Sequence, residues 1–197
     1  MRVTLFDYGA GNIHSLAKAL ATTAGAEVRV QVDPVKALDT DVLILPGVGA
    51  FGAAAARLEP GREQMRQALQ EGLPCLGICL GMQLLFEGSD EGEGRGLAVF
   101  KGWVTRLQAK HVPHIGWNSV EEDAAVSGAK LDSVYYAHSF VCRAEEPDVV
   151  SGWTTHEDDR FPASVRRGKV LGVQFHPEKS SAAGVRFVQA FLREVAP

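Results

Sequence analysis

The sequence predicts an α/β fold whose central sheet is mixed but mostly parallel and is covered by helices on both faces. Short apolar runs alternate with amphipathic segments through the first half of the chain, a pattern typical of right-handed βαβ crossovers. Glycines and prolines mark the turns between these segments. Of the 197 residues, 46% are hydrophobic, which is enough for a substantial core. The length suits one domain, which we place over residues 1–197.

The elements of the first half follow in order. Short apolar runs predict strands over residues 3–6, 27–32, 42–45 and 76–78. The segments between and after them predict helices over residues 12–24, 62–71 and 80–87. Gly25 and Gly72 stand where the first two helices should end, and Asp33 with Pro34 predicts a short capped helix. Together these elements give the parallel part of the sheet.

The pattern changes at residue 88. Residues 88–96 are polar and rich in glycine, but they are acidic and lack the Lys-Ser/Thr ending of a phosphate-binding loop. We therefore interpret them as a solvated connection. Arg167 and Gly168 predict a hairpin turn, and residues 181–195 an amphipathic helix. Short strands are expected over residues 103–107, 133–136, 149–153, 163–166 and 170–175.

Composition argues against several classes of function. The net charge is −4 without a Lys/Arg-rich run, which disfavours a nucleic-acid partner. The three cysteines lack metal-ligand spacing, and their odd number disfavours a disulfide framework. We expect no metal, a reducing compartment such as the cytoplasm, and core positions for Cys75 and Cys142. The chain starts as a strand rather than a signal peptide, and no apolar run approaches about 18 residues, so no membrane span is expected.

Cys79 stands at the apex of a predicted strand–turn–helix, with Gly77 and Gly81 on either side. This is the nucleophile-elbow pattern with cysteine in place of serine. The turn strains its central residue, and the flanking glycines avoid collisions. A thiolate at the start of the following helix is favoured by the helix dipole. Taken alone, the motif could also hold a structural buried cysteine.

His176 and Glu178 follow the apolar run 170–175, which Pro177 ends. In extended backbone, residues two apart face the same side, so the two side chains can point together. The histidine can then act as base toward the thiol while the glutamate orients it. A lone pair of this kind would more often be a surface turn. Two such motifs at strand ends of one parallel sheet predict a shared site.

Attack of a thiolate on an amide carbonyl creates an oxyanion, which needs fixed N–H donors. The backbone N–H of Leu80, directly after the cysteine, is one candidate. A second should come from a neighbouring strand-to-helix loop. Residues 46–51 form such a loop, with Val48 between two glycines. Considered alone, this loop would be an ordinary turn.

Residues 77–83 together with residues 176–178 resemble the class I, triad-type glutamine amidotransferases. Within that family, five blocks resemble the glutaminase subunit of imidazole glycerol phosphate synthase, and they span nearly the whole chain. These blocks are residues 7–12, 46–51, 114–118, 135–140 and 176–180.

The resemblance implies a flavodoxin-like three-layer αβα fold that hydrolyses L-glutamine to glutamate and ammonia without a cofactor. Cys79 would be the nucleophile that forms a thioester, His176 the general acid and base, and Glu178 its orienter. The oxyanion-hole amides would be those of Val48 and Leu80. The positions matched to glutamine binding are Gly49, Gln83, Ser139 and Phe140.

Gln83 lies one helical turn after Cys79, which places both on one face of the predicted helix. The alternative for Gln83 is an exposed helix residue.

The chain shows no acceptor-binding domain that could use the ammonia. The family supplies one as a cyclase partner with a (β/α)₈ barrel that receives ammonia through a channel, so we expect a heterodimer. Asn12, Trp117 and Lys179 match positions near that interface. From the residues alone, they could instead be a helix cap, a core aromatic and a solvated lysine.

Other functions remain open at this point. The nearest is the glutaminase of another pathway, such as pyridoxal phosphate or aminodeoxychorismate synthesis, although the 46–51 loop and the block around Trp117 argue against it. A cysteine peptidase or a redox-sensing chaperone of similar fold is a more distant alternative. A non-catalytic binding module is disfavoured by the complete triad.

Overall fold

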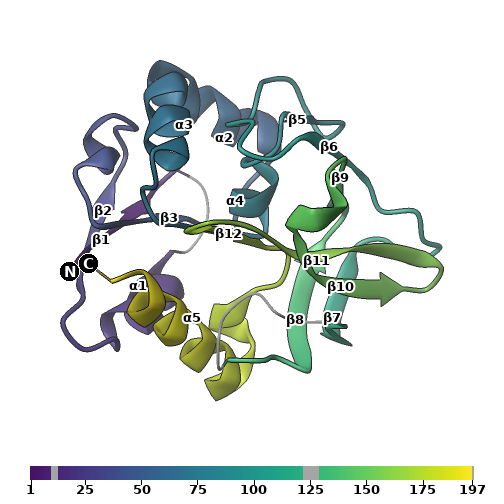
Figure 1. Cartoon of the computed structure of the whole chain (residues 1–197). Coiled ribbons are helices and arrows are strands. Elements are labelled where there is room, and N and C mark those ends of the chain that lie inside the picture. Colours follow the sequence, from purple (N-terminus) through teal and green to yellow (C-terminus); the bar gives the residue numbers. More distant parts are fainter. Residues whose placement is uncertain (10–12, 122–128, 197) are drawn as a thin grey trace.

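The computed structural model describes residues 1–9, 13–121 and 129–196. A seven-stranded sheet with the order β10-β11-β12-β4-β3-β1-β2 runs through the molecule (Figure 1). The five strands from β12 to β2 are parallel, and β11 and β10 add an antiparallel edge. The predicted mixed, mostly parallel sheet is therefore confirmed. Its strands are Arg2–Phe6 (β1), Glu27–Gln31 (β2), Val42–Leu45 (β3), Cys75–Ile78 (β4), Val150–His156 (β10), Asp159–Arg167 (β11) and Val170–Val173 (β12).

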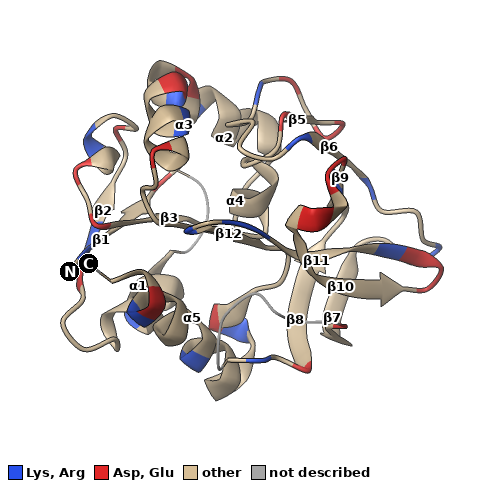
Figure 2. Cartoon of the chain, in the orientation of Figure 1, with Lys and Arg blue, Asp and Glu red and all other residues tan. Residues whose placement is uncertain are grey.

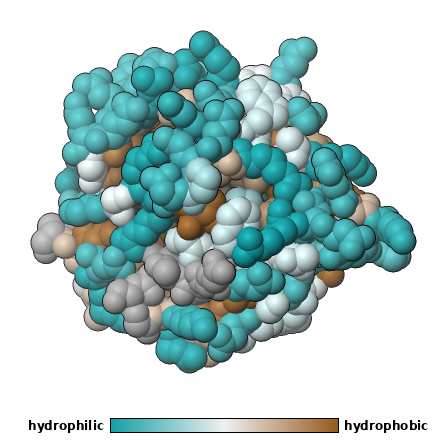
Figure 3. Space-filling model, turned by 45° about the vertical axis from the view of Figure 1, so that its right-hand side comes forward, coloured by the Kyte–Doolittle hydropathy of each residue, from teal (hydrophilic) through white to brown (hydrophobic). Residues whose placement is uncertain are grey.

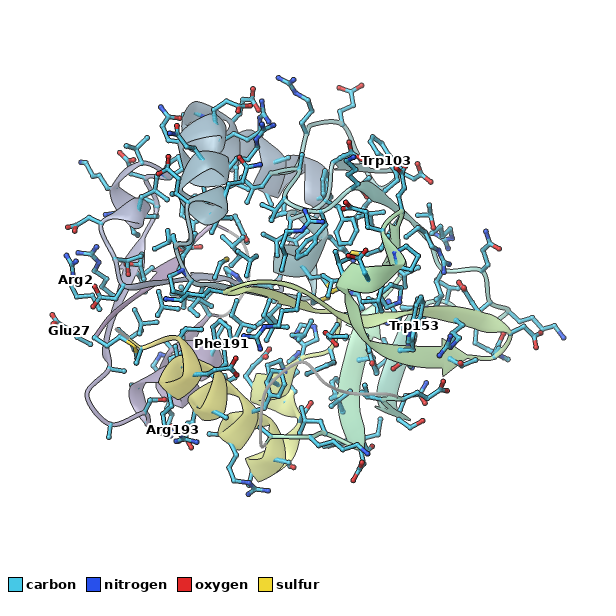
Figure 4. The ribbon with its side chains drawn as sticks, in the orientation of Figure 1. Arg2, Glu27, Trp103, Trp153, Phe191 and Arg193 are labelled. Carbon is cyan, nitrogen blue, oxygen red and sulfur yellow. The ribbon has the colours of Figure 1, made fainter. Side chains whose placement is uncertain are left out.

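Helices cover both faces of this sheet (Figure 1). One face carries α2 (Phe51–Leu58), α3 (Arg62–Gln70) and α4 (Leu80–Gln83), and the other carries α1 (His14–Ala21) and α5 (Ser181–Val195). Alternate strand residues enter separate cores, as period-two side chains must: Leu5 packs into one core and Phe6 into the other. Phe191 points from α5 toward the sheet (Figure 4).

Two smaller sheets come from the second half of the chain. The first pairs β5 (Gly88–Ser89), β6 (Gly102–Arg106) and β9 (Phe140–Ala144), and the second pairs β7 (His114–Ser119) with β8 (Ser133–His138). Short 3₁₀ turns complete the described elements, at Lys36–Leu38, Glu59–Gly61, Pro147–Val149 and Pro177–Lys179. Because the Tyr135 carbonyl accepts the His176 N–H at 2.8 Å, the β7–β8 hairpin lies against the carboxyl end of β12.

The helix predicted over residues 80–87 ends at Gln83, so that prediction was wrong in its second half. The carbonyls of the next residues bond to a later part of the chain instead of continuing the helix. Leu84 accepts the Leu97 N–H at 2.7 Å, and Glu87 accepts the Gly96 N–H at 2.9 Å. Helix α4 is thus a single turn that presents Cys79 and Gln83 and then gives way to a buried loop.

Helix α2 and strands β7 and β9 were not predicted. The first residue of α2, Phe51, donates its N–H to Glu91 Oε2 at 3.0 Å, a cap from a distant segment. The interpretation of residues 88–96 as a solvated connection was also wrong in part. Gly88 and Ser89 form the buried strand β5, and Glu91 reaches the start of α2.

Several local predictions are confirmed. Gly168 has a positive φ of 57° at the turn between the antiparallel strands β11 and β12. Asp33 Oδ1 accepts the N–H groups of Val35 and Lys36 at 2.9 and 3.0 Å, which caps the short turn that follows. Cys75 and Cys142 are free thiols without exposed surface.

The surface mixes charges of both signs over the helices and the β10–β11 hairpin (Figure 2). The face that Figure 3 shows is largely hydrophilic, with scattered hydrophobic atoms. Within the described ranges, no helix is long and apolar enough to cross a membrane.

Candidate active site

Cys79 occupies a strained elbow between β4 and α4, with φ 48° and ψ −104°. Its N–H donates to the Val173 carbonyl at 2.7 Å, which holds the turn against β12. The flanking glycines have no room for a side chain. A Cβ on Gly81 would lie 2.0 Å from the Leu45 carbonyl oxygen, and one on Gly77 would lie 2.7 Å from the backbone of Gly81. The elbow is therefore fixed by backbone packed directly on backbone.

His176 and Glu178 lie together at the end of β12, as their spacing predicts. His176 Nδ1 donates to Glu178 Oε1 at 2.8 Å, which leaves Nε2 for the thiol. A serine closes this turn: Ser180 Oγ donates to the His176 carbonyl at 2.7 Å and accepts the Tyr135 N–H at 2.9 Å. The imidazole is thus held by its own turn and by strand β8.

The electrostatics of the site favour a charged imidazole. Burial by itself lowers the pKa of His176, but the adjacent Cys79 sulfur and then Glu178 outweigh burial and raise the pKa to about 10. Near neutral pH, His176 is therefore an imidazolium that can donate to the Cys79 sulfur. This proton is the one that a leaving amine needs.

A cavity of about 480 Å³ opens over the thiol. Gly47 lies at its base, where a Cβ would meet Cys79 Cβ at 2.9 Å and His176 Cε1 at 3.0 Å. The loop after β3 consequently lies directly against the triad. The cavity wall includes most residues that the sequence singled out, namely Val48, Gly49, Cys79, Leu80, Gln83, Ser139, Phe140, His176 and Lys179.

Gln83 is buried rather than an exposed helix residue, so the surface alternative for this position was wrong. Its Nε2 donates to the Phe140 carbonyl at 3.0 Å. This bond connects the elbow helix to β9. Gln83, Ser139 and Phe140 line the cavity together, as does Val48 from the loop after β3.

Hydrogen bonds between side chains join Asn118, His114 and His138 into a chain that we call the histidine relay, and His138 itself lines the cavity. His138 Nδ1 lies 3.1 Å from the Phe140 carbonyl, which can only accept, so Nδ1 carries the hydrogen. His138 Nε2 then accepts from His114 Nδ1 at 3.1 Å, and His114 Nε2 accepts from Asn118 Nδ2 at 3.4 Å. One consistent set of tautomers satisfies every step.

Both relay histidines are neutral. Burial, with a smaller effect of His114, lowers the pKa of His138 to about 3. Burial, with a smaller effect of His156, lowers the pKa of His114 to about 4. The relay therefore keeps its polarity, with donors pointing toward Phe140, throughout the neutral range.

The residues matched to a partner interface have different outcomes. Trp117 is 55% exposed on β7, so it is not a core aromatic, and Ile115 beside it is 63% exposed. Lys179 is exposed, and its Nζ lies 5.9 Å from the centre of the Tyr135 ring. Asn12 lies outside the described residues. Ile115 and Lys179 both line the cavity, so this exposed surface is continuous with its mouth.

A profile of the family "Glutamine amidotransferase class-I" matches residues 4–195. The chain belongs to the class I glutamine amidotransferases. This membership decides against the cysteine-peptidase and chaperone alternatives, and it confirms the resemblance of the elbow and His-Pro-Glu motifs.

Relatives of this amidotransferase narrow its place in the family. The imidazole glycerol phosphate synthase subunit HisH of Pyrococcus furiosus is 41% identical over 98% of each chain. HisH of Aquifex aeolicus is 43% identical, over 98% of this chain and 97% of that one. HisH of Corynebacterium glutamicum is 40% identical over 98% of each chain. The amidotransferase is therefore a subunit of the HisH type.

Solved structures agree on the fold. A crystal structure described as a glutamine amidotransferase superposes with a TM-score of 0.78 at 22% identity, over 99% of both chains. A glutamine amidotransferase from Thermotoga maritima superposes with a TM-score of 0.65 at 19% identity, over 99% of this chain and 84% of that one. At these identities the likeness concerns the fold alone.

Sequence reasoning missed four polar residues of the amidotransferase site. Glu91, Arg106 and His138 line the cavity, and Gln174 reaches the Cys79 sulfur. Only Gln174 carried a signal that could have found it, because a glutamine interrupts an apolar strand two residues before His176. Within the described ranges, no group of three His, Cys, Asp or Glu side chains is arranged to hold a metal ion.

Proposed function

We propose that this HisH-type amidotransferase hydrolyses L-glutamine with Cys79, His176 and Glu178 as its catalytic triad. The observation that carries the proposal is the strained elbow at Cys79 beside the His176–Glu178 pair, under a cavity with two backbone amides nearby. Geometry of this kind serves acyl transfer to a nucleophile. The ammonia would then be consumed by the imidazole glycerol phosphate synthase reaction of histidine biosynthesis.

The steps follow from the positions of these groups. The Cys79 sulfur attacks the side-chain amide carbon, and the N–H groups of Val48 and Leu80 stabilise the oxyanion. His176 gives its proton to the amide nitrogen, and the C–N bond breaks. Ammonia departs, and a thioester with Cys79 remains. Water then loses a proton to His176 and attacks the thioester, which releases glutamate and returns the electron pair to sulfur. Glu178 holds the imidazole in the orientation needed for both transfers.

The cavity also carries charges suited to an amino acid. Glu91 and Arg106 both line it, one for each sign. Free glutamine has an α-ammonium and an α-carboxylate, which such a pair can bind by charge-assisted hydrogen bonds. Gly49, Gln83, Ser139 and Phe140 would hold the rest of the molecule. We assign the glutamine side chain to the end of the cavity at Cys79.

A cyclase subunit with a (β/α)₈ barrel completes the proposal as the second half of a heterodimer. The exposed Ile115 and Lys179 line the cavity, and the exposed Trp117 lies two residues from Ile115 on β7, so a partner bound there would receive ammonia without passage through bulk water. Aromatic residues with large exposed surface are frequent anchors of such interfaces. We place the heterodimer in the cytoplasm, a compartment that suits three free thiols.

A glutamine analogue with an electrophilic side chain tests the chemistry. It should alkylate Cys79 and spare the buried Cys75 and Cys142, as read by peptide mapping. Cys79→Ala should abolish glutamate release while the circular dichroism spectrum stays unchanged. Label on another cysteine, or glutamate release by Cys79→Ala, would contradict the assignment.

Titration with the cyclase subunit tests the partner. Glutamate release should rise when a liganded cyclase binds, and Trp117→Ala should weaken binding at least tenfold. Trp103→Ala is the matched control, because Trp103 is 45% exposed on β6, which belongs to a different sheet from β7. Equal binding by wild type and Trp117→Ala would place the interface elsewhere.

A further inference from the structure

Gln174 is a buried amide that neither the fold nor the triad accounts for. Its side chain has no exposed surface, and its neighbours Val173 and Phe175 belong to the apolar core. Gln174 Nε2 lies 3.5 Å from Cys79 Sγ, whereas Oε1 is buried without a hydrogen-bond partner among the described residues. An amide oxygen in this state costs stability that an apolar side chain would not. Packing alone does not explain a glutamine here.

The orientation of the amide decides what it does to the sulfur. A thiolate only accepts hydrogen bonds, so an N–H toward it is attractive, whereas a carbonyl oxygen would set two electron-rich atoms against each other. His176 is the other donor in contact with this sulfur. The sulfur therefore has one donor that gives up its proton during the reaction and one, Gln174, that keeps it.

We propose that Gln174 is a further catalytic residue, whose side-chain amide donates to the Cys79 sulfur and stabilises its negative charge. The inference rests on the proposed function, because it takes Cys79 as the nucleophile. Gln174 touches the reacting atom itself.

The charge on sulfur changes through the cycle, and the effect of Gln174 changes with it. The sulfur is negative before attack, carries no charge as a thioester, and becomes negative again when water has attacked and the C–S bond breaks. Hydrogen bonds to charged acceptors are about twice as strong as neutral ones. The amide therefore stabilises the thiolate relative to the thioester. It favours the ionised thiol at rest and assists its departure during hydrolysis of the thioester.

Gln174→Met tests this with an unbranched apolar side chain of similar length. The rate of Cys79 alkylation by iodoacetamide is measured against pH, with the label located by mass spectrometry. In the variant, we expect the pH at which the alkylation rate is half-maximal to rise by about one unit. This is the size expected for the loss of a charge-assisted hydrogen bond. With L-glutamine and the cyclase, the variant should also accumulate the thioester, visible as a glutamyl adduct in the intact mass.

Ser164→Ala is the matched control. Ser164 is fully buried on β11 and accepts a hydrogen bond from Ser151 at 2.9 Å, so its substitution leaves both donors to the Cys79 sulfur in place. Its profile should coincide with that of wild type. Gln174→Asn is the second variant, because the amide is then one methylene short of the sulfur, and it should shift the profile in the same direction as Gln174→Met.

A measurement on the unaltered protein completes the test. The side-chain amide resonance of Gln174 should titrate with the same midpoint as Cys79 alkylation. The inference would be overturned if the chemical shift of the Gln174 amide did not change with Cys79 ionisation. It would also be overturned if both variants had the same pH dependence of alkylation as wild type. If wild type itself neither alkylates at Cys79 nor releases glutamate, the proposed function fails instead, so the two failures are distinguishable.

Discussion

Two regions of the molecule meet at the cavity and hold their groups by different means. On one side, β3, β4 and α4 fix Cys79 through backbone contacts, with no space for a Cβ on Gly77 or Gly81. On the other side, the β7–β8 hairpin and β9 hold the Phe140 carbonyl through the histidine relay and the Gln83 amide. Cys79 is thus held by contacts between backbone atoms, whereas the Phe140 carbonyl is held by hydrogen bonds from side chains.

The difference corresponds to what each region has to do. A nucleophile loses rate when it is displaced by an ångström, and backbone packed on backbone allows the least displacement. The wall that holds a substrate exchanges hydrogen bonds with it, which side chains in a network can do. We therefore expect substitutions on the elbow side to affect folding or kcat, and substitutions in the relay to act through its titrating groups.

Of these substitutions, we expect Glu178→Gln to have the largest effect on kcat, because the Glu178 side chain completes the triad. The amide keeps the shape but removes the charge that stabilises imidazolium, so kcat should fall by about 10⁴, and by less than in His176→Ala. Glutamate release with saturating cyclase is the measurement. Glu146→Gln removes a surface carboxylate paired with Arg167 and should leave kcat unchanged. Full activity in Glu178→Gln would reduce Glu178 to a turn residue.

Gly81→Ala probes the backbone contacts directly. The new Cβ would lie 2.0 Å from the Leu45 carbonyl oxygen, so the elbow must shift, and we expect a loss of about 3 kcal/mol or more in the free energy of unfolding. Gly92→Ala is the control, because its nearest atom would be 3.4 Å away, in ordinary contact. Urea unfolding should find that control within about 0.5 kcal/mol of wild type. Comparable losses in both variants would show that the backbone contact at Gly81 is no more restrictive than the packing of an ordinary loop glycine.

His138→Gln tests the relay through its pH dependence. Burial lowers the pKa of His138 to about 3, so below pH 6.5 the unfolded chain binds a proton that the folded chain does not. Wild-type stability should therefore fall as the pH drops from about 6.5 toward 4, and Gln should reduce that slope by up to about 1.4 kcal/mol per pH unit. The raised pKa of His176 adds stability that is fully present below about pH 6.5 and is lost as the pH rises from there toward about 10, so His176 does not affect the slope below pH 6.5.

Urea unfolding between pH 4.5 and 7.5 provides these slopes. His111→Gln is the control: it removes a surface histidine, 85% exposed and paired with Glu157, and should change the slope less than His138→Gln does. If His138→Gln and wild type lost stability in parallel, His138 would not be buried in its neutral form.

Lys179→Ala should have the smallest effect on the isolated chain. It removes a cation from over the Tyr135 ring, a contact worth about 0.5–1 kcal/mol at an exposed site. For a chain of this length, the melting temperature should fall by about 2–4 °C per kcal/mol, and alkylation of Cys79 should not change. Slower alkylation would mean that Lys179 supports the elbow as well as the cavity mouth.

The sequence predicted the elbow side far better than the relay side. Strands β1 to β4 follow the periodicity of a βα repeat, and Cys79 and His176 stand at strand ends, where local sequence is informative. Strand β7 was missed because it carries polar and aromatic residues without clear alternation, and β9 because it is a run of only five residues interrupted by Arg143. His138 lies beyond the strand predicted over residues 133–136, and its partners His114 and Asn118 come from β7, which was not predicted. The cap of α2 could not be predicted from local sequence either, because Glu91 and Phe51 are 40 residues apart and come into contact only in the folded chain.

The close approach of α5 to the catalytic turn affects the order in which parts of the chain can fold during translation. A Cβ on Gly184 would lie 2.0 Å from the Pro177 carbonyl oxygen, so the helix is the floor on which the His176 turn rests. Strand β4, with Cys79 at its end, pairs with β12, which is translated far later. A growing chain therefore carries β4 as an unpaired strand edge, open to association with other chains, until residues 170–195 emerge. The same delay keeps the nucleophile apart from its base until that late segment has folded.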